Sequence, residues 1–252
     1  MEPIRKPFQG VLNIIRFNWH FYVLAFALVT LLILSANYFD QSVQAWIYVL
    51  SFLTLASVLI SLLTSFYIYD LSGLYNLAWI EQSGFEAQIV TVSAGFDETS
   101  SLLQDKFKNA GLIALDFYDP AKHTEVSIKR ARRAYPPFPG TRQIETGKLP
   151  LPDNSADKLF VILSAHEIRN EEERIIFFRE LKRIIKADGR IYITEHLRDL
   201  PNFIAYNIGF FHFHSRNSWL KTFEGASLKI SKEIKLTPFI STFILVKNGN
   251  TF

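Results

Sequence analysis

Two long stretches of the chain contain no Asp, Glu, Lys or Arg, and they constrain the fold more than any other feature. The first lies between Arg16 and Asp40, and the second lies between Asp40 and Asp70. Each is longer than the ~20 residues that a helix needs to cross the hydrocarbon core of a bilayer. We therefore predict an N-terminal hairpin of two transmembrane helices, with spans at about 18–38 and 45–68.

A cleaved signal peptide and a pair of buried core helices are the alternatives for these stretches. A signal peptide has one short apolar core and does not continue into a second long apolar segment, so the membrane hairpin is favoured. Arg5, Lys6 and Arg16 precede the first span, whereas the joint between the spans contains no Lys or Arg. Positive charge favours the cytoplasmic side. We expect an integral protein of the inner (cytoplasmic) membrane, with its N-terminus and everything after the second span in the cytoplasm.

The composition excludes several classes of function. The 252 residues include no cysteine, which rules out disulfides, thiolate nucleophiles and cysteine-ligated metal centres. A net charge of +3 from 27 basic and 24 acidic residues is too balanced for nucleic acid to be a main partner. The basic run "KRARR" at 129–133 can instead meet anionic headgroups of the membrane, so we expect membrane lipid as a partner and no nucleic acid.

From Asp70 onward, strand-like and helix-like segments alternate, which is the βαβ pattern of a mostly parallel sheet covered by helices. We expect a short amphipathic connector near the bilayer over 70–85 and one cytoplasmic α/β domain over 86–252. The predicted strands are 87–93, 111–116, 142–145, 158–164, 190–195 and an antiparallel pair, 227–236 and 239–247.

Local signals also predict where the helices begin and end. Thr124 can cap a helix over 125–135. Asn170 followed by Glu173 has the spacing of a capping box, and Gly189 is placed to stop the helix that follows.

Two segments of this domain carry a family resemblance. They read "LPLPDNSADKLFVILSAHEI" (149–168) and "EEERIIFFRELKRIIKADGRIYITE" (171–195). With the terminal strand pair, they resemble the class I S-adenosylmethionine-dependent methyltransferases, particularly the small-molecule type that contains ubiquinone and sterol methylating enzymes. The resemblance covers about 86–249. It implies a seven-stranded Rossmann-like sheet with an antiparallel last strand, and S-adenosylmethionine bound across the carboxyl ends of the first four strands.

The stretch "TVSAGFDET" at 91–99 aligns with the first motif of that family, where an acidic residue precedes a Gly-x-Gly-x-Gly loop. Thr91 stands where the acid is usual, Ser93 replaces the first glycine, Gly95 keeps the second and Asp97 replaces the third. Gly95 allows the backbone to approach the methionine part of the cofactor, and Asp97 can capture its ammonium group. The alternative is that these changes mark a weakened or abandoned cofactor site.

Other cofactor contacts follow from the resemblance. Asp116 ends the second predicted strand, where a carboxylate accepts hydrogen bonds from both ribose hydroxyls; a surface Asp that supports a turn is the alternative. Glu145 matches the acidic position that faces the adenine amino group, or is an ordinary solvated glutamate. The implied cofactor-binding set is Ser93, Ala94, Gly95, Asp97, Asp116, Phe117, Glu145, Thr146 and Ser164.

Candidate catalytic groups follow the fourth and fifth predicted strands, whose ends meet at one edge of the sheet. These are His166, Glu195 and His196. A histidine with a pKa near neutrality could take a proton from a hydroxyl, an amine or an acidic carbon, and a hydrogen-bonded structural histidine is the alternative for each. The aromatic segment 203–219, with His212 and His214, suggests a lid over an apolar substrate or a helix packed against the bilayer.

No His-x-x-x-His spacing occurs on a predicted helix, so no metal is expected. The sequence therefore predicts a membrane-anchored enzyme that transfers a methyl group from S-adenosylmethionine to a small lipophilic acceptor. The alternative is a catalytically inactive, methyltransferase-like binding or assembly protein on the same anchor.

Overall fold

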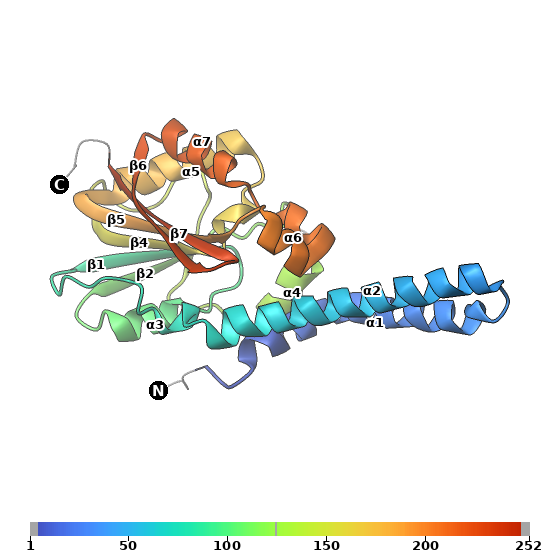
Figure 1. The fold of residues 1–252 in the computed structure, drawn as a ribbon. Helices are drawn as coiled ribbons and strands as arrows, with labels where there is room; N and C mark the ends of the chain where they lie inside the picture. The colour runs from blue at the N-terminus through green and yellow to red at the C-terminus, as the bar shows by residue number, and fades with distance from the viewer. Residues whose placement is uncertain (1–4, 124, 248–252) are drawn as a thin grey trace.

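Two long antiparallel helices project away from a sheet-containing domain (Figure 1) in the computed structural model, which describes residues 5–123 and 125–247. They are α1 (Gln9–Ala36) and α2 (Gln41–Phe66). The Asp40 side chain caps α2 by accepting the backbone N–H groups of Ser42 and Val43. The two helices contain the predicted spans, and α1 begins well before its span.

Both helices are long and apolar enough to cross a membrane, with mean hydropathy of 2.0 and 2.2. Only 11% of the apolar window of each helix is buried against the rest of the chain. Large side chains such as Trp46 and Phe52 are 68% and 69% exposed. Continuous exposed apolar surface of this kind marks a site of contact with a membrane or another protein.

The sheet of the following domain has seven strands in the order β3-β2-β1-β4-β5-β7-β6. Strands β1 to β5 are parallel, β7 is antiparallel to β5, and β6 is antiparallel to β7. This topology confirms the predicted Rossmann-like α/β sheet with an antiparallel last strand. The strands are β1 (Gln88–Ser93), β2 (Gly111–Asp116), β3 (Arg142–Gln143), β4 (Ala156–Ile162), β5 (Ile185–His196), β6 (Leu228–Thr237) and β7 (Ile240–Lys247).

Helices cover both faces of this sheet, and α5 and α7 lie together over one of them (Figure 1). Because side chains alternate along a strand, Val90 and Val92 of β1 pack toward α5 and α7, whereas Ile89 packs toward α3. Burial on both faces explains why β4 is mostly apolar in sequence. The helices of the domain are α3 (Ser100–Lys106), α4 (Val126–Ala134), α5 (Glu171–Ile184), α6 (Leu200–Tyr206) and α7 (Arg216–Gly225).

The helix signals are confirmed only in part. The Asn170 side chain accepts the backbone N–H of Glu173, as a helix cap does. The prediction for Gly189 is wrong, because α5 ends at Ile184 and the chain passes directly into β5, where Gly189 lies inside the strand. A Cβ at Gly189 would lie 2.9 Å from the carbonyl oxygen of Asp157, so close approach to β4 explains this glycine. Thr124, the predicted cap of α4, lies outside the described residues.

The segment predicted as an amphipathic connector is instead part of the domain. The end of α2 continues as a π-helical turn (Tyr67–Leu71) and then a short 3₁₀ turn (Leu74–Asn76). Leu74, Leu77 and Ile80 are at most 2% exposed and join the core on the α3 side of the sheet and at the end of the hairpin. The connector is therefore docked by apolar burial rather than spread on a bilayer surface.

Polar contacts also fix the hairpin to the domain. The carboxylate of Asp70, after α2, accepts the N–H groups of Gly10 and Val11 at 2.8 Å each, which satisfies the first turn of α1. Glu98, in the loop after β1, accepts hydrogen bonds from Arg5 at 2.8 Å and from the Tyr75 hydroxyl at 2.7 Å. The first turns of α1 are thereby held beside the carboxyl edge of the sheet.

Candidate active site

A cavity of about 240 Å³ lies at the carboxyl edge of the sheet, where β1 and β4 are neighbours. The strand order reverses between these two strands, and open α/β sheets bind ligands at such a switch point. Leu163, which lines the cavity directly after β4, has a positive φ of 52°, a conformation that is costly for a leucine and is found where function constrains the backbone. One wall is formed by the first turns of α1, namely Gly10, Asn13, Ile14, Phe17 and Asn18.

The loop after β1 forms the floor of this cavity. Ser93, Ala94 and Asp97, three of the residues predicted to bind the cofactor, line it. Gly95 has a φ of +92°, and a Cβ there would lie 2.7 Å from the ring of Tyr118. Asp97 supports the loop itself, because one carboxylate oxygen accepts the N–H groups of Thr99 and Ser100 at 2.9 Å each and the other accepts the Ser100 hydroxyl. The predicted capture of an ammonium group would compete with these bonds.

Asp116 lies at the end of β2 and is buried. Its Oδ1 accepts the N–H groups of Gly95 at 2.8 Å and Tyr118 at 2.9 Å, so this carboxylate shapes the loop after β1. Its Oδ2 pairs with the guanidinium of Arg132 on α4 at 2.6 Å, and that guanidinium also lies over the Tyr118 ring. Ribose hydroxyls can reach Oδ2 only if Arg132 moves away.

Gly95, Asp116 and the remaining predicted cofactor residues lie outside the cavity lining. Glu145 is exposed, and the Thr146 hydroxyl donates to Glu173 at 2.6 Å. Phe117 is buried in the core on the α5 side of the sheet. The Ser164 hydroxyl donates to the carbonyl oxygen of Val92 at 2.9 Å, which ties the end of β4 to β1.

His166 follows β4, and β5 brings Glu195 beside it, as the parallel pairing of these strands predicts. The His166 Nδ1–H donates to Oε2 of the fully buried Glu195 at 2.6 Å, and its Nε2 lies 3.4 Å from Oε1 of Glu167. Burial opposes protonation of His166, but the two carboxylates outweigh it and raise its pKa to about 10. The expectation of a pKa near neutrality is wrong for this residue, which carries its proton at pH 7.

His196, at the end of β5, has the opposite character. The Asn202 amide nitrogen donates to Asp199 and to the Phe239 carbonyl, which leaves its oxygen to accept the His196 Nδ1–H at 3.0 Å. The His196 Nε2 is therefore an acceptor, and the hydroxyl of Tyr69 donates to it at 2.9 Å. Burial lowers the pKa of His196 to about 4, again away from neutrality, so this ring is neutral at pH 7.

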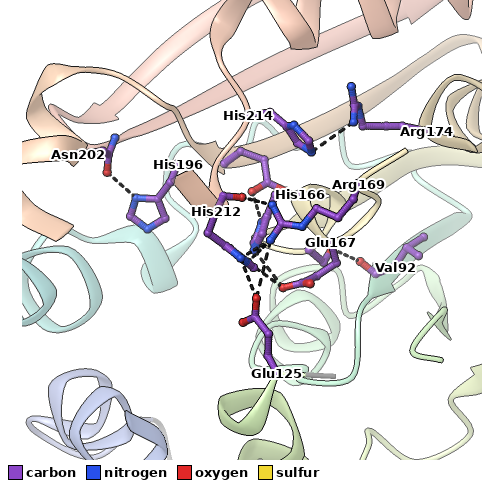
Figure 2. A network of polar contacts seen from close by, with 12 residues as sticks. Val92, Glu125, His166, Glu167, Arg169, Arg174, His196, Asn202, His212 and His214 are labelled. Atoms are coloured by element: carbon purple, nitrogen blue, oxygen red, sulfur yellow. Dashed lines mark hydrogen bonds and ion pairs between the residues drawn. The ribbon is translucent and has the colours of Figure 1, made fainter. Parts of the chain in front are cut away.

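The structure brings further groups to the cavity that the sequence did not single out. The sequence suggests that Tyr69 lies at the membrane interface, and its position in the chain does not indicate its contact with His196. Glu125, before α4, pairs with Nδ1 of His212 at 2.8 Å, and Nε2 of His212 lies 3.2 Å from Glu167 (Figure 2). Three separate segments thus meet in one network of polar contacts.

Residues 90–193 match the family model described as a methyltransferase domain. A SAM-dependent methyltransferase from Aquifex aeolicus is 15% identical, with a TM-score of 0.49, and the match covers 75% of this chain and 97% of that one.

Two further solved structures are similar. A SAM-dependent methyltransferase from Methanosarcina mazei is 13% identical over 66% of this chain and 94% of that one, with a TM-score of 0.48. LepI in complex with SAM is 14% identical over 68% of this chain and 45% of that one, with a TM-score of 0.46. Comparison with curated proteins gives no match.

The matched residues run from β1 to β5 and contain the loop after β1, Asp116 and His166. The residues from β1 to β5 therefore resemble a methyltransferase domain, and S-adenosylmethionine is the cofactor that the sequence predicts for it. The position of the cavity at the switch point fits this cofactor, whereas the buried carboxylate of Asp116 holds the loop after β1 and does not itself line the cavity. On the ribose side the fit requires Arg132, whose side chain is 31% exposed, to release that carboxylate.

Proposed function

We propose that this protein is a membrane-anchored methyltransferase that acts on a small lipophilic acceptor dissolved in the inner leaflet. The observation that supports this most is the shared cavity wall: Asn13, Ile14 and Phe17 of α1 face the same space as Ser93 and His196 of the sheet domain. An acceptor that leaves the bilayer along α1 enters the cavity without crossing water.

The proposed orientation places the N-terminus and the domain in the cytoplasm. Arg130 of α4 donates to the carbonyl oxygen of Phe17 at 2.7 Å and lies over the ring of Trp19, at the level where the uncharged part of α1 begins. Aromatic and basic side chains at this level are typical of a membrane interface. The domain would therefore sit against the headgroups, with the distal part of the hairpin in the hydrocarbon.

His196 is the proposed general base. Its Nε2 is an acceptor, it lines the cavity, and the Asn202 hydrogen bond holds the ring in the tautomer that a base needs. His166 is not suited to act as the base because it is already protonated at pH 7. Glu195 positions His166, and does not line the cavity itself. Bound S-adenosylmethionine supplies an electrophilic methyl group on sulfonium.

The chain's own contribution is alignment and proton transfer. The loop after β1 fixes one side of the cavity, α1 and the aromatic segment around Phe213 enclose the other, and the acceptor is held between them. Holding the reacting groups in line contributes much of a bimolecular rate enhancement. The Tyr69 hydroxyl is hydrogen-bonded to Nε2 of His196 until a methyl acceptor with a transferable proton takes its place.

The test is a methylation assay with membrane-reconstituted protein. Lipid extracts are incubated with S-adenosylmethionine that carries an isotopically labelled methyl group, and labelled products are sought by mass spectrometry. We expect a labelled lipophilic product, and a fall in turnover of about 10²-fold or more for His196→Gln, with unchanged cofactor affinity. His20→Gln, which changes a histidine of α1 outside the cavity, is the matched control. Full turnover by His196→Gln would remove this residue from the mechanism.

One observation favours the second candidate, an inactive methyltransferase-like assembly protein. The carboxylate of Asp116 is already paired with Arg132, and the Tyr118 ring covers Gly95. An abandoned cofactor site would keep such contacts permanently. Calorimetric titration of S-adenosylmethionine into folded, detergent-solubilised protein separates the candidates, because heat of binding at micromolar ligand supports the enzyme and its absence at millimolar ligand supports the assembly protein.

A further inference from the structure

Two histidines and one glutamate converge on the cavity wall from two different parts of the chain. The potential metal-binding atoms of His166, Glu167 and His212 all lie within 4.8 Å of one another. The Nε2 atoms of the two histidines lie 3.4 Å and 3.2 Å from the same oxygen, Oε1 of Glu167. All three side chains line the cavity. The sequence predicts no metal because no His-x-x-x-His spacing occurs on a predicted helix, but the fold brings together residues from separate segments.

Each histidine is held by a second carboxylate on its other nitrogen. The Nδ1–H of His166 donates to Glu195 at 2.6 Å, and the Nδ1–H of His212 donates to Glu125 at 2.8 Å (Figure 2). Metal-binding histidines almost always donate their other N–H to a carboxylate, a carbonyl or water, which fixes the tautomer and the ring orientation. Both Nε2 atoms are thereby directed toward Glu167, as ligands of one ion must be.

The buried part of the cluster already holds a positive charge that a metal ion can replace. Glu167 and Glu195 have side chains that are 8% and 0% exposed, and His166 lies between them as their cationic partner. A metal ion at Nε2 of His166 would take the place of the proton there, since metal binding to histidine releases a proton. The nearby guanidinium is that of Arg169, which is 43% exposed, contacts the ring and the carbonyl oxygen of His212, and lies 3.8 Å from Glu125. The guanidinium also lies 2.9 Å from Nε2 of His212, so Arg169 has to turn away toward solvent for an ion to take that position.

We propose that His166, Glu167 and His212 form a site for a divalent first-row transition metal ion, oriented by Glu195 and Glu125. Two imidazoles and one carboxylate suit Zn²⁺, Fe²⁺ or Mn²⁺ and leave coordination positions open. Because the site faces the same cavity as His196, the open positions would hold an oxygen of the acceptor. A metal-bound hydroxyl loses its proton more easily.

This inference rests on the proposed function and narrows it to O-methylation of a lipophilic molecule with an ionisable hydroxyl. The hydroxyl proton passes to Nε2 of His196, the new bond forms between the acceptor oxygen and the methyl carbon, and the bond from that carbon to sulfur breaks.

The test uses full-length protein purified in detergent without a histidine tag and stripped with a chelator. Zn²⁺ is titrated by calorimetry, and Co²⁺ by its visible absorption, which reports nitrogen ligation. We expect one equivalent to bind, with affinity reduced at least about tenfold by Glu167→Gln or His212→Gln and about 10- to 100-fold by Glu125→Gln. His20→Gln is the control and should bind normally.

Two outcomes would overturn the metal site. One is no binding of Zn²⁺ or Co²⁺ at 100-fold excess to protein whose folding is confirmed by circular dichroism. The other is binding that Glu167→Gln and His212→Gln leave unchanged, which would place the metal elsewhere and identify the cluster as an ion-pair network.

Titrating S-adenosylmethionine into the same samples separates this failure from failure of the proposed function. Cofactor binding and methyl transfer that persist in chelator would retain the enzyme and reject the metal. Metal binding without any cofactor binding would reject the enzyme and retain the site.

Discussion

Asp116 offers the sharpest test of the cofactor site, because one of its oxygens supports the fold and the other can accept a ligand only in place of Arg132. In Asp116→Ala, the N–H groups of Gly95 and Tyr118 lose their acceptor. Each unsatisfied buried donor costs about 1–3 kcal/mol, and these are partly buried, so we expect a loss of about 2–4 kcal/mol in the free energy of unfolding. For a domain of this size, that lowers Tm by about 4–16 °C.

Asp116→Asn separates support of the loop from ligand binding. The amide oxygen still accepts from Gly95 and Tyr118, and only the ion pair with Arg132 is lost, so stability should fall by no more than about 1 kcal/mol. Loss of a charged acceptor for ribose hydroxyls costs about 1.5–3 kcal/mol, so the affinity for S-adenosylmethionine should fall at least about tenfold. Calorimetric titration and thermal unfolding of the same sample measure both effects.

Arg132→Ala is the complementary variant. If the guanidinium competes with the ribose for Asp116, its removal saves the cost of breaking a partly exposed ion pair, and affinity should rise by up to about fivefold. Cofactor affinity that stays unchanged in both Asp116→Asn and Arg132→Ala would refute the reasoning, because the carboxylate at the end of β2 would then play no part in cofactor binding.

Three further predictions concern pH, the loop after β1 and the anchor. Burial lowers the pKa of His214 to about 3 and that of His196 to about 4. Below pH 6.5 these two histidines therefore bind more protons in the unfolded chain than in the folded one. The free energy of unfolding should fall from pH 6.5 toward pH 4, by up to about 1.4 kcal/mol per pH unit for each histidine. Equal urea midpoints at pH 6.5 and pH 5 would contradict this. Gly95→Ala should lower Tm, because alanine at a φ of +92° is strained and its Cβ meets Tyr118, and an unchanged Tm would show that the loop relaxes freely. The protein should remain in the membrane pellet after an alkaline carbonate wash, and its release into the supernatant would argue against spanning helices.

The order of the secondary structure was predictable because local patterns determine it. The two long apolar runs predict α1 and α2, and the mostly apolar sequence of β4 predicts a strand that is buried on both faces. The errors lie where tertiary contacts override local signals. Gly189 has the sequence context of a helix stop, but it lies in β5 because a side chain there would collide with β4. The segment after Asp70 has an amphipathic sequence, but its apolar side chains are buried in the core of the domain.

The candidate site was predictable only for residues that lie at or just after the carboxyl end of a strand. Ser93, His166 and His196 follow from the rule that the carboxyl ends of parallel strands meet at one edge. The pKa values of His166 and His196 did not follow from it, because they depend on which partners burial leaves beside each ring. Tyr69 and Glu125 could not be found from spacing, since they reach the cavity from outside the strand ends.

By itself, the sequence determined the class of fold, the two apolar helices and the edge of the sheet at which chemistry is expected, because periodicity, composition and strand order are local properties of the chain. Only the tertiary structure decided that Arg132 pairs with Asp116, that α1 forms a wall of the cavity, and that His166, Glu167 and His212 converge. Those contacts join residues far apart in sequence, and their geometry is set by how helices and sheet pack, which no spacing along the chain encodes.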